Sequence, residues 1–154
     1  DAVDIPVIAA GGIGDGRGIA AAFMLGAKAV QMGTRFVATE ECHVHENYKQ
    51  FLLKARDIDT RVTGRTTGHP VRTLRNPMTK EYLEKEAAGA SFEELELLTL
   101  GGLRKAVVDG DVKTGSVMSG QIAGMVKDEK SCKEIIEQMM NEMEELLKGA
   151  PARL

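Results

Sequence analysis

A chain of 154 residues with 43% hydrophobic and 28% charged residues has the composition of an ordinary folded domain and is long enough to bury a core. Its net charge of −3 gives no reason to expect a nucleic-acid partner, and no apolar run reaches the roughly 18 residues of a membrane span. Two cysteines are too few for a disulfide framework, so we expect a reducing, cytoplasmic location.

Two short apolar segments, residues 5–10 and 28–32, have the composition of β-strands, and the alanine-rich segment 16–25 between them has that of a helix. Both strand segments are apolar without alternation, which indicates burial on both faces and favours a parallel pair. The strand–helix–strand order is that of a βαβ unit. We therefore expect an α/β fold that begins with this unit.

Each of these strands ends in a glycine turn, Gly11-Gly12 after the first and Gly33-Thr34 after the second. Glycine lets backbone N–H groups approach an anion closely, and the helix at 16–25 is expected to point its N-terminus at the first turn. In eight-stranded α/β barrels a phosphate commonly binds after strands seven and eight. The sequence therefore predicts a phosphate site at these turns, with the Gln31 amide free for a polar part of the ligand. A tight turn that binds nothing is the alternative.

The number of strands is small for a complete barrel, which has eight strands in roughly 250 residues. A two-stranded parallel sheet leaves edges and apolar faces uncovered. We expect residues 1–40 to form the last two βα units of a barrel and residues 41–154 a helical and loop extension packed on it. The N-terminal part of the barrel is then expected from the remainder of the same protein. A small self-contained α/β domain is the alternative.

The middle of the chain predicts one helix and one long loop. Segment 45–55 has apolar residues three and four positions apart, at 48, 51, 52 and 55, which is typical of a helix with one buried face. Segment 59–63 predicts a short strand. Segment 64–78 is rich in Gly, Pro, Thr and Arg, and we expect an ordered loop there.

The last third is expected to be mainly helical. Helices at 91–100 and 131–149 each begin with a capping box, and a shorter helix at 103–108 follows a glycine pair. The last helix is predicted to bury one apolar face, made of Ile135, Ile136, Met139, Met140, Met143, Leu146 and Leu147. Five glutamates are expected in water: Glu84, Glu86, Glu93, Glu94 and Glu96.

Several other side chains carry groups that could take part in chemistry. Cys42, His43 and His45 lack a second pair of ligands, so no metal site is expected and a solvated helix start is favoured. His69 could act as a general acid, although a loop histidine that holds the backbone is favoured because no carboxylate lies near it in sequence. Arg72 and Arg75 either bind an anionic substrate or fix the loop by pairing with carboxylates.

Four segments, taken together and in this order, resemble one enzyme superfamily: residues 10–13, 31–36, 68–76 and 115–121. It is the FMN-dependent group that contains the nitronate monooxygenases (2-nitropropane dioxygenases) and the flavin-type enoyl-[acyl-carrier-protein] reductases of bacteria. Segments 55–60 and 105–112 resemble the reductase branch more closely. The segment 115–121 either packs against the cofactor or makes a close contact with a helix.

The resemblance implies the C-terminal part of a TIM barrel that binds FMN, with flavin contacts at Gly11, Gly12, Gln31, Met32, Gly33 and Thr34. It implies hydride transfer from NADH or NADPH through the flavin to a trans-2-enoyl thioester on acyl carrier protein, in fatty acid synthesis. It places the catalytic histidine on an earlier strand, so we expect no catalytic residue in this chain. We also expect a homodimer.

Three other functions fit the same turns. A nitronate monooxygenase would use the same flavin pocket without a nicotinamide coenzyme. A phosphate-binding barrel enzyme without flavin, such as a sugar-phosphate isomerase or a nucleotide dehydrogenase, belongs to a second class. A regulatory module without enzymatic activity belongs to a third.

Overall fold

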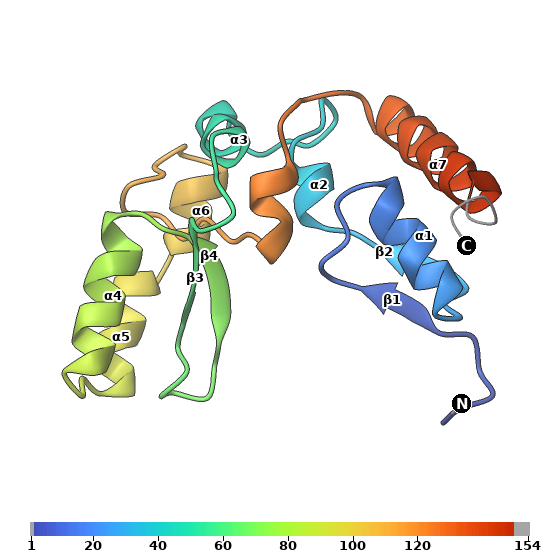
Figure 1. Ribbon diagram of the computed structural model, residues 1–154. Helices are drawn as coiled ribbons and strands as arrows, with labels where there is room; N and C mark the ends of the chain where they lie inside the picture. The colour runs from blue at the N-terminus through green and yellow to red at the C-terminus, as the bar shows by residue number, and fades with distance from the viewer. Residues whose placement is uncertain (1, 150–154) are drawn as a thin grey trace.

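The computed structural model describes residues 2–149 as two lobes that meet at a central group of short helices (Figure 1). One lobe contains β1, β2, α1 and α7, and the other contains β3, β4, α4, α5 and α6. The bounds are β1 Ile8–Ala10, α1 Gly16–Met24, β2 Ala29–Gln31, α2 Thr34–Val37, α3 Glu46–Leu53, β3 Thr60–Thr63, β4 Val71–Leu74, α4 Pro77–Ala87, α5 Phe92–Thr99, α6 Gly102–Val107, a 3-10 helix η1 Gln121–Met125, and α7 Cys132–Gly149. Within residues 2–149, none of the helices combines the length and the apolar composition needed to cross a bilayer.

The βαβ unit is present as the sequence predicts. Strands β1 and β2 are parallel, with Ala9 opposite Val30, and α1 connects them. The expected burial of both faces is wrong for this chain, because Val7 and Ile8 are 49% and 59% exposed. Among residues 2–149 this sheet has two strands, and α1 covers one of its faces (Figure 1).

Helix α7 packs along α1 and completes the core of this lobe (Figure 1). Its buried residues are Ile135, Met139 and Met143, spaced four apart as a helix face requires. The predicted face is too wide, because Ile136 and Met140 are exposed. Helix α7 contacts α1 through a single row of residues, so the positions on either side of that row are exposed to solvent.

The two helices are in close contact at Gly16. A Cβ atom at this position would lie 2.5 Å from the Met139 carbonyl oxygen and 2.7 Å from the Glu142 Cβ. The backbone N–H of Gly16 donates to Glu142 Oε2 at 2.8 Å. Glycine at this position therefore permits both the close approach and a hydrogen bond between the helices.

Segment 64–78 is not a single loop, which corrects the sequence prediction. Strand β4 pairs antiparallel with β3, with Arg61 opposite Thr73, so only the hairpin tip before β4 is irregular. Helix α4 then begins at Pro77, and the Asn76 side chain caps it by accepting from the Thr79 N–H at 2.8 Å. An N-cap asparagine followed by proline is a helix start signal that the Gly- and Pro-rich composition obscured.

Glu86 is buried at 9% exposure, so its predicted place in water is wrong. It accepts hydrogen bonds from the Thr66 N–H at 3.0 Å and the Thr66 hydroxyl at 2.9 Å. Burial raises the pKa of Glu86, but hydrogen bonds from Thr66, Gly64 and Arg65 outweigh it, and the pKa lies below its ordinary value. The carboxylate thereby ties the hairpin tip to α4.

The helix predictions at 45–55 and 91–100 are confirmed, with slightly shorter bounds. Tyr48 and Leu52 of α3 are buried in the central core with Val117 and Val126. Helix α5 has the complete capping box, in which Ser91 and Glu94 each accept from the other's backbone N–H. In both helices the capping residues at the start and the apolar residues that face the core favour the same structure.

Candidate functional site

The two glycine turns lie at one edge of the β1–β2 pair. Ala10 is opposite Gln31 in the parallel register, so the residues that follow each strand leave the sheet side by side. Gly11 and Gly12 have φ values of +87° and +74°, which L side chains rarely adopt. A Cβ atom on either glycine would meet no atom within 4 Å. The backbone conformation therefore requires glycine, and the space above the turn is open.

The second turn leads into the short helix α2, whose N-cap is Gly33. The first N–H groups of a helix have no partner within it, and those of α2 lie at the same edge as the first turn. The Thr34 hydroxyl oxygen accepts a hydrogen bond from the Gly120 N–H at 2.8 Å. This contact orients the hydroxyl and leaves its proton to donate to a ligand. A short helix after the last strands is also the arrangement of barrel phosphate sites.

The N-terminus of helix α1, which was expected to contribute N–H groups to the anion site, does not do so. The Asp15 carboxylate caps α1 by accepting from the Gly18 N–H at 3.1 Å, and Glu142 accepts from the Gly16 N–H. Burial raises the pKa of Asp15, but hydrogen bonds from Arg17 and Gly18 hold it below its ordinary value. Two carboxylates therefore occupy this N-terminus, and the N–H groups left for an anion are those of the two turns.

The last two predicted ligand residues differ in exposure. Gln31 is exposed at the end of β2, where its amide is accessible. Met32 is half-buried and packs against the core between α1 and α7. Met32 is therefore placed to contribute backbone rather than side chain to the edge.

One ion pair fixes helix α2, and a second fixes the chain just after it. Arg35 is buried, and its guanidinium donates to Asp128 Oδ1 at 2.6 Å and to the Asp128 carbonyl oxygen at 3.1 Å. The buried Lys49 ammonium donates to Glu129 Oε1 and to the Thr39 carbonyl oxygen, both at 2.6 Å. The segment that contains Asp128 and Glu129 thus fixes the short helix next to the turn. A hydrogen bond from Lys130, with the charge of Arg35, lowers the pKa of the Asp128 carboxyl.

We expect the Asp128 pair to stabilise the protein at neutral pH and to lose this effect in acid. Because the folded pKa of Asp128 is lowered, its contribution is present above the unfolded pKa and is lost as the pH falls through the folded pKa. Asp128→Asn should therefore lower the melting temperature at pH 7 and have a smaller effect near pH 3. Thermal unfolding of the full-length protein at the two pH values measures this difference.

Glu84→Gln is the matched control, because the Glu84–Lys80 pair is exposed on both sides. It should leave the melting temperature almost unchanged at both pH values. An Asp128→Asn effect of equal size at pH 7 and pH 3 would contradict the assigned role of the charge.

Of the remaining sequence candidates, His45 and Arg72 make hydrogen bonds within the fold, whereas His69 and Arg75 are exposed. His45 caps α3 by accepting from the Asn47 N–H through Nδ1 at 3.0 Å, as the predicted helix start requires. The Arg72 guanidinium donates to the Thr60 hydroxyl at 3.0 Å across the hairpin. His69 is exposed, and its ring lies 5.6 Å from that of Phe92 at a tilt of 53°. Arg75 is also exposed at the end of β4.

Segment 115–121 runs between the two lobes and makes the close helix contact that is one of the two roles predicted for it. A Cβ atom on Gly115 would lie 2.7 Å from the Ala106 backbone nitrogen, so this glycine serves a close contact with α6. At the other end of the segment, the Gly120 N–H donates to the Thr34 hydroxyl oxygen, next to the two glycine turns. The Ser119 hydroxyl is buried without a hydrogen-bond partner among the described residues.

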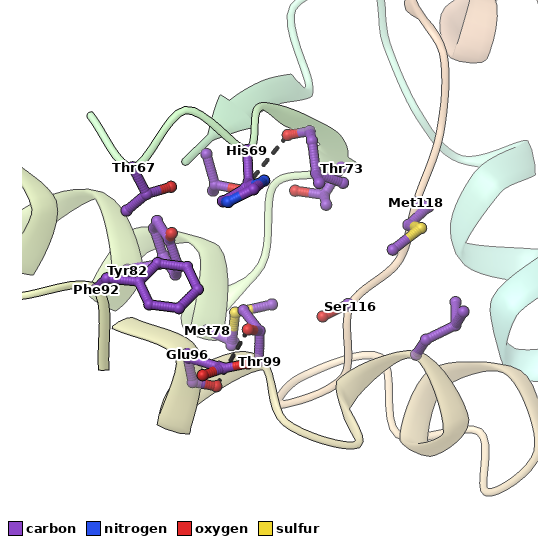
Figure 2. Close-up of a pocket in the computed structure, with 13 residues that line it drawn as sticks. Thr67, His69, Thr73, Met78, Tyr82, Phe92, Glu96, Thr99, Ser116 and Met118 are labelled. Carbon is purple, nitrogen blue, oxygen red and sulfur yellow. Dashed lines mark hydrogen bonds between the residues drawn. The ribbon is translucent and has the colours of Figure 1, made fainter. Parts of the chain in front are cut away.

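A cavity of about 350 Å³ lies in the second lobe, and sequence reasoning missed it (Figure 2). Figure 2 shows Tyr82 and Phe92 on one side of it and Ser116 and Met118 on the other. Its walls come from β3, β4, α4, α5, α6 and segment 115–121, which are not adjacent in sequence. The sequence signal for this cavity is weak: two aromatic residues, Tyr82 and Phe92, lie ten positions apart in a chain with 4% aromatic residues.

Solved structures confirm the fold prediction. The chain aligns over 99% of its length with the structure of FabK from Thermotoga maritima, at 50% identity and a TM-score of 0.91. It aligns over 96% of its length with nitroalkane oxidase from Streptomyces ansochromogenes, at 33% identity and a TM-score of 0.75. It covers 48% and 42% of those chains, in their C-terminal portion. The predicted C-terminal part of an α/β barrel is therefore correct.

Sequence comparisons agree with the structural ones. The family model for nitronate monooxygenase matches residues 1–142. A probable nitronate monooxygenase of Staphylococcus saprophyticus is 33% identical over 96% of this chain and 41% of its own length. A Mycobacterium tuberculosis protein named (3aS,4S,5R,7aS)-5-hydroxy-7a-methyl-1-oxo-octahydro-1H-indene-4-carboxyl-CoA dehydrogenase is 34% identical over 88% of this chain and 49% of its own length. The chain thus spans less than half the length of these relatives, and it belongs to the nitronate monooxygenase family.

Proposed function

We propose that this chain is the flavin-phosphate-binding part of an FMN-dependent enoyl-[acyl-carrier-protein] reductase. The observation that carries the proposal is the 50% identity to FabK over 99% of the chain, against 33% to the probable nitronate monooxygenase and to nitroalkane oxidase. The likeness of segments 55–60 and 105–112 to the reductase branch agrees with it.

The residues at the β1–β2 edge fit the phosphate end of FMN. Gly11 and Gly12 offer backbone N–H groups beneath open space, since no atom of residues 2–149 lies within 4 Å of a Cβ position built on either glycine. Gly33 and Thr34 offer the first N–H groups of α2 and an oriented hydroxyl. Charge-assisted hydrogen bonds of this kind are the strong ones, so several together can anchor a phosphate. Gln31 is placed to donate to a polar group of the cofactor.

Under this proposal the bound flavin supplies the hydride-transfer chemistry, with NADH or NADPH as the donor and an enoyl thioester as the acceptor. This chain binds and orients the cofactor, and the catalytic residue belongs to the remainder of the protein. We propose that this remainder completes the barrel against the exposed faces of β1 and β2. The substrate is carried by acyl carrier protein, and the enzyme is a cytoplasmic homodimer of fatty acid biosynthesis.

A second candidate function is nitronate monooxygenase activity, because the matching family model and a relative that covers 96% of this chain both have that name. The same phosphate site serves both reactions. Measurements of turnover, and not of flavin binding, therefore decide between the reductase and the monooxygenase.

We expect the full-length protein to oxidise a reduced nicotinamide coenzyme when crotonyl thioester is added. The reason is that the enoyl acceptor allows the reduced flavin to be reoxidised in each cycle. The measurement is loss of nicotinamide absorbance, with crotonyl thioester and with its saturated butyryl counterpart as the control substrate.

The second arm of the experiment supplies a nitronate and oxygen without a nicotinamide coenzyme. Oxygen consumption there, with no enoyl-dependent turnover, would assign the protein to the monooxygenase branch. A purified full-length protein without flavin absorbance would overturn both candidates.

A further inference from the structure

The cavity in the second lobe has the size of a small-molecule site. It lies outside the flavin edge, which is the proposed phosphate site at Gly11, Gly12, Gly33 and Thr34. Its volume is about 350 Å³, within the range of ligand pockets. Figure 2 shows that the labelled side chains surround a common space, with His69 and Thr73 on one side and Glu96 and Thr99 opposite. The cavity is therefore bounded by several elements and is not a groove along one helix.

The lining favours a neutral apolar ligand. Large apolar and aromatic side chains contribute much of the wall, among them Tyr82, Phe92, Leu103 and Met118. The described residues that line it include one carboxylate, Glu96, and no lysine or arginine. A phosphate or a free carboxylate would meet no lysine or arginine among these residues and would face Glu96. A nucleotide and a free fatty acid are both disfavoured on this ground.

The cavity is connected to the flavin edge through segment 115–121. Met118 lines the cavity, and Gly120, two residues later, donates to the Thr34 hydroxyl oxygen. Two residues of extended chain span roughly 7 Å. The Tyr48 hydroxyl donates to the Met118 carbonyl oxygen at 2.5 Å, and Met118 also bridges Thr73 of β4. The backbone between the two sites is therefore fixed at both ends.

We infer that this cavity binds the acyl chain of the thioester substrate and sets the chain length that the enzyme accepts. The inference rests on the proposed reductase function, because it requires an acyl thioester at the flavin edge. A cavity of about 350 Å³ has room for roughly ten methylene-sized groups, since a water-sized group takes roughly 30 Å³. Met118 lines the cavity two residues before Gly120, which contacts Thr34, and the paired rings of Phe92 and His69 line it as well.

The experiment measures kcat/KM of the full-length enzyme with enoyl thioesters of four, six, eight and ten carbons. Each methylene buried in the cavity should raise kcat/KM by up to about fourfold. Thr99 is half-buried in the wall, and Thr99→Phe fills part of the space. We expect it to lower kcat/KM about tenfold or more for the ten-carbon substrate and less than about twofold for the four-carbon one.

Two further variants keep the test falsifiable. Leu97→Phe is the matched control, because Leu97 lies on the same helix, is 74% exposed and does not line the cavity. It should leave the chain-length profile unchanged. Leu103→Ala enlarges the cavity at a half-exposed wall position and should shift the preference towards longer chains. Equal chain-length profiles for the wild type, Thr99→Phe and Leu103→Ala would overturn the inference.

A binding measurement separates failure of the inference from failure of the proposed function. Decanoyl-pantetheine, a saturated thioester that cannot be reduced, is titrated into the full-length wild type and both phenylalanine variants by calorimetry. Binding that Thr99→Phe weakens about tenfold and Leu97→Phe preserves supports the cavity even if no enoyl thioester is turned over. Binding that is absent, or equal in all three proteins, overturns the cavity assignment even if the reductase reaction is observed.

Discussion

Gly12→Val is expected to abolish flavin binding by the full-length protein. Gly12 has a φ of +74°, so a β-branched residue would be strained there, and its side chain would enter the open space assigned to the phosphate. The loss of phosphate contacts removes the anchor of the cofactor. The measurement is the flavin absorbance per mole of purified protein.

The matched control is Gly89→Val, which imposes the same kind of backbone strain at a distant site. Gly89 follows α4, has a φ of +83° and also has open space around its Cβ position. This variant should lose some thermal stability and retain its flavin. Full flavin occupancy in Gly12→Val, or equal flavin loss in both variants, would sink the phosphate assignment.

Gly16→Ala is expected to destabilise the protein by about 3 kcal/mol, although replacing a helical glycine by alanine ordinarily stabilises by about 0.5–1 kcal/mol. The sign reverses because the new Cβ would meet backbone atoms of α7, with the Met139 carbonyl oxygen at 2.5 Å and the Met143 nitrogen at 2.8 Å. Backbone cannot move aside as a flexible side chain can, so α7 must shift away from α1. Denaturant unfolding of the full-length protein measures the change.

Gly18→Ala provides the comparison within the same helix. Its Cβ would lie 3.1 Å from Ile13 Cγ2, a side-chain atom that can move by a few tenths of an ångström. We expect its stability to remain within about 1 kcal/mol of the wild type. A Gly16→Ala protein as stable as Gly18→Ala would show that the α1–α7 contact is looser than the structure indicates.

The elements that sequence reasoning predicted well are those with local causes. The turn after β1 needs glycine for its positive φ, and α5 starts at Ser91 because a capping box satisfies its first N–H groups. Both requirements are written within a few neighbouring residues. Strand β4 was missed because its four residues, Val71–Leu74, carry little signal, and pairing with β3 decides their structure.

The features that sequence reasoning missed depend on residues far apart in the chain. Glu86 is charged and lies on a helix, which predicts exposure, but Thr66 supplies two hydrogen bonds that make its burial tolerable. The cavity wall combines Thr63 with Met118, and no periodicity links those positions. The glycine turns after β1 and β2 were predictable from neighbouring residues, whereas the Gly120–Thr34 contact was not, because 86 residues separate its partners.

The packing of α7 on α1 has a consequence for biosynthesis. Gly16 and Glu142 bond directly across 126 residues of chain, so α1 leaves the ribosome long before its packing partner exists. Until α7 is made, the buried face of α1, with Ile19 and Ala22, is exposed to water and to other nascent chains. Contacts of such long range slow folding, because the loop must close before they contribute. We therefore expect ribosome-bound chains that stop before Cys132 to aggregate more readily than chains that include α7.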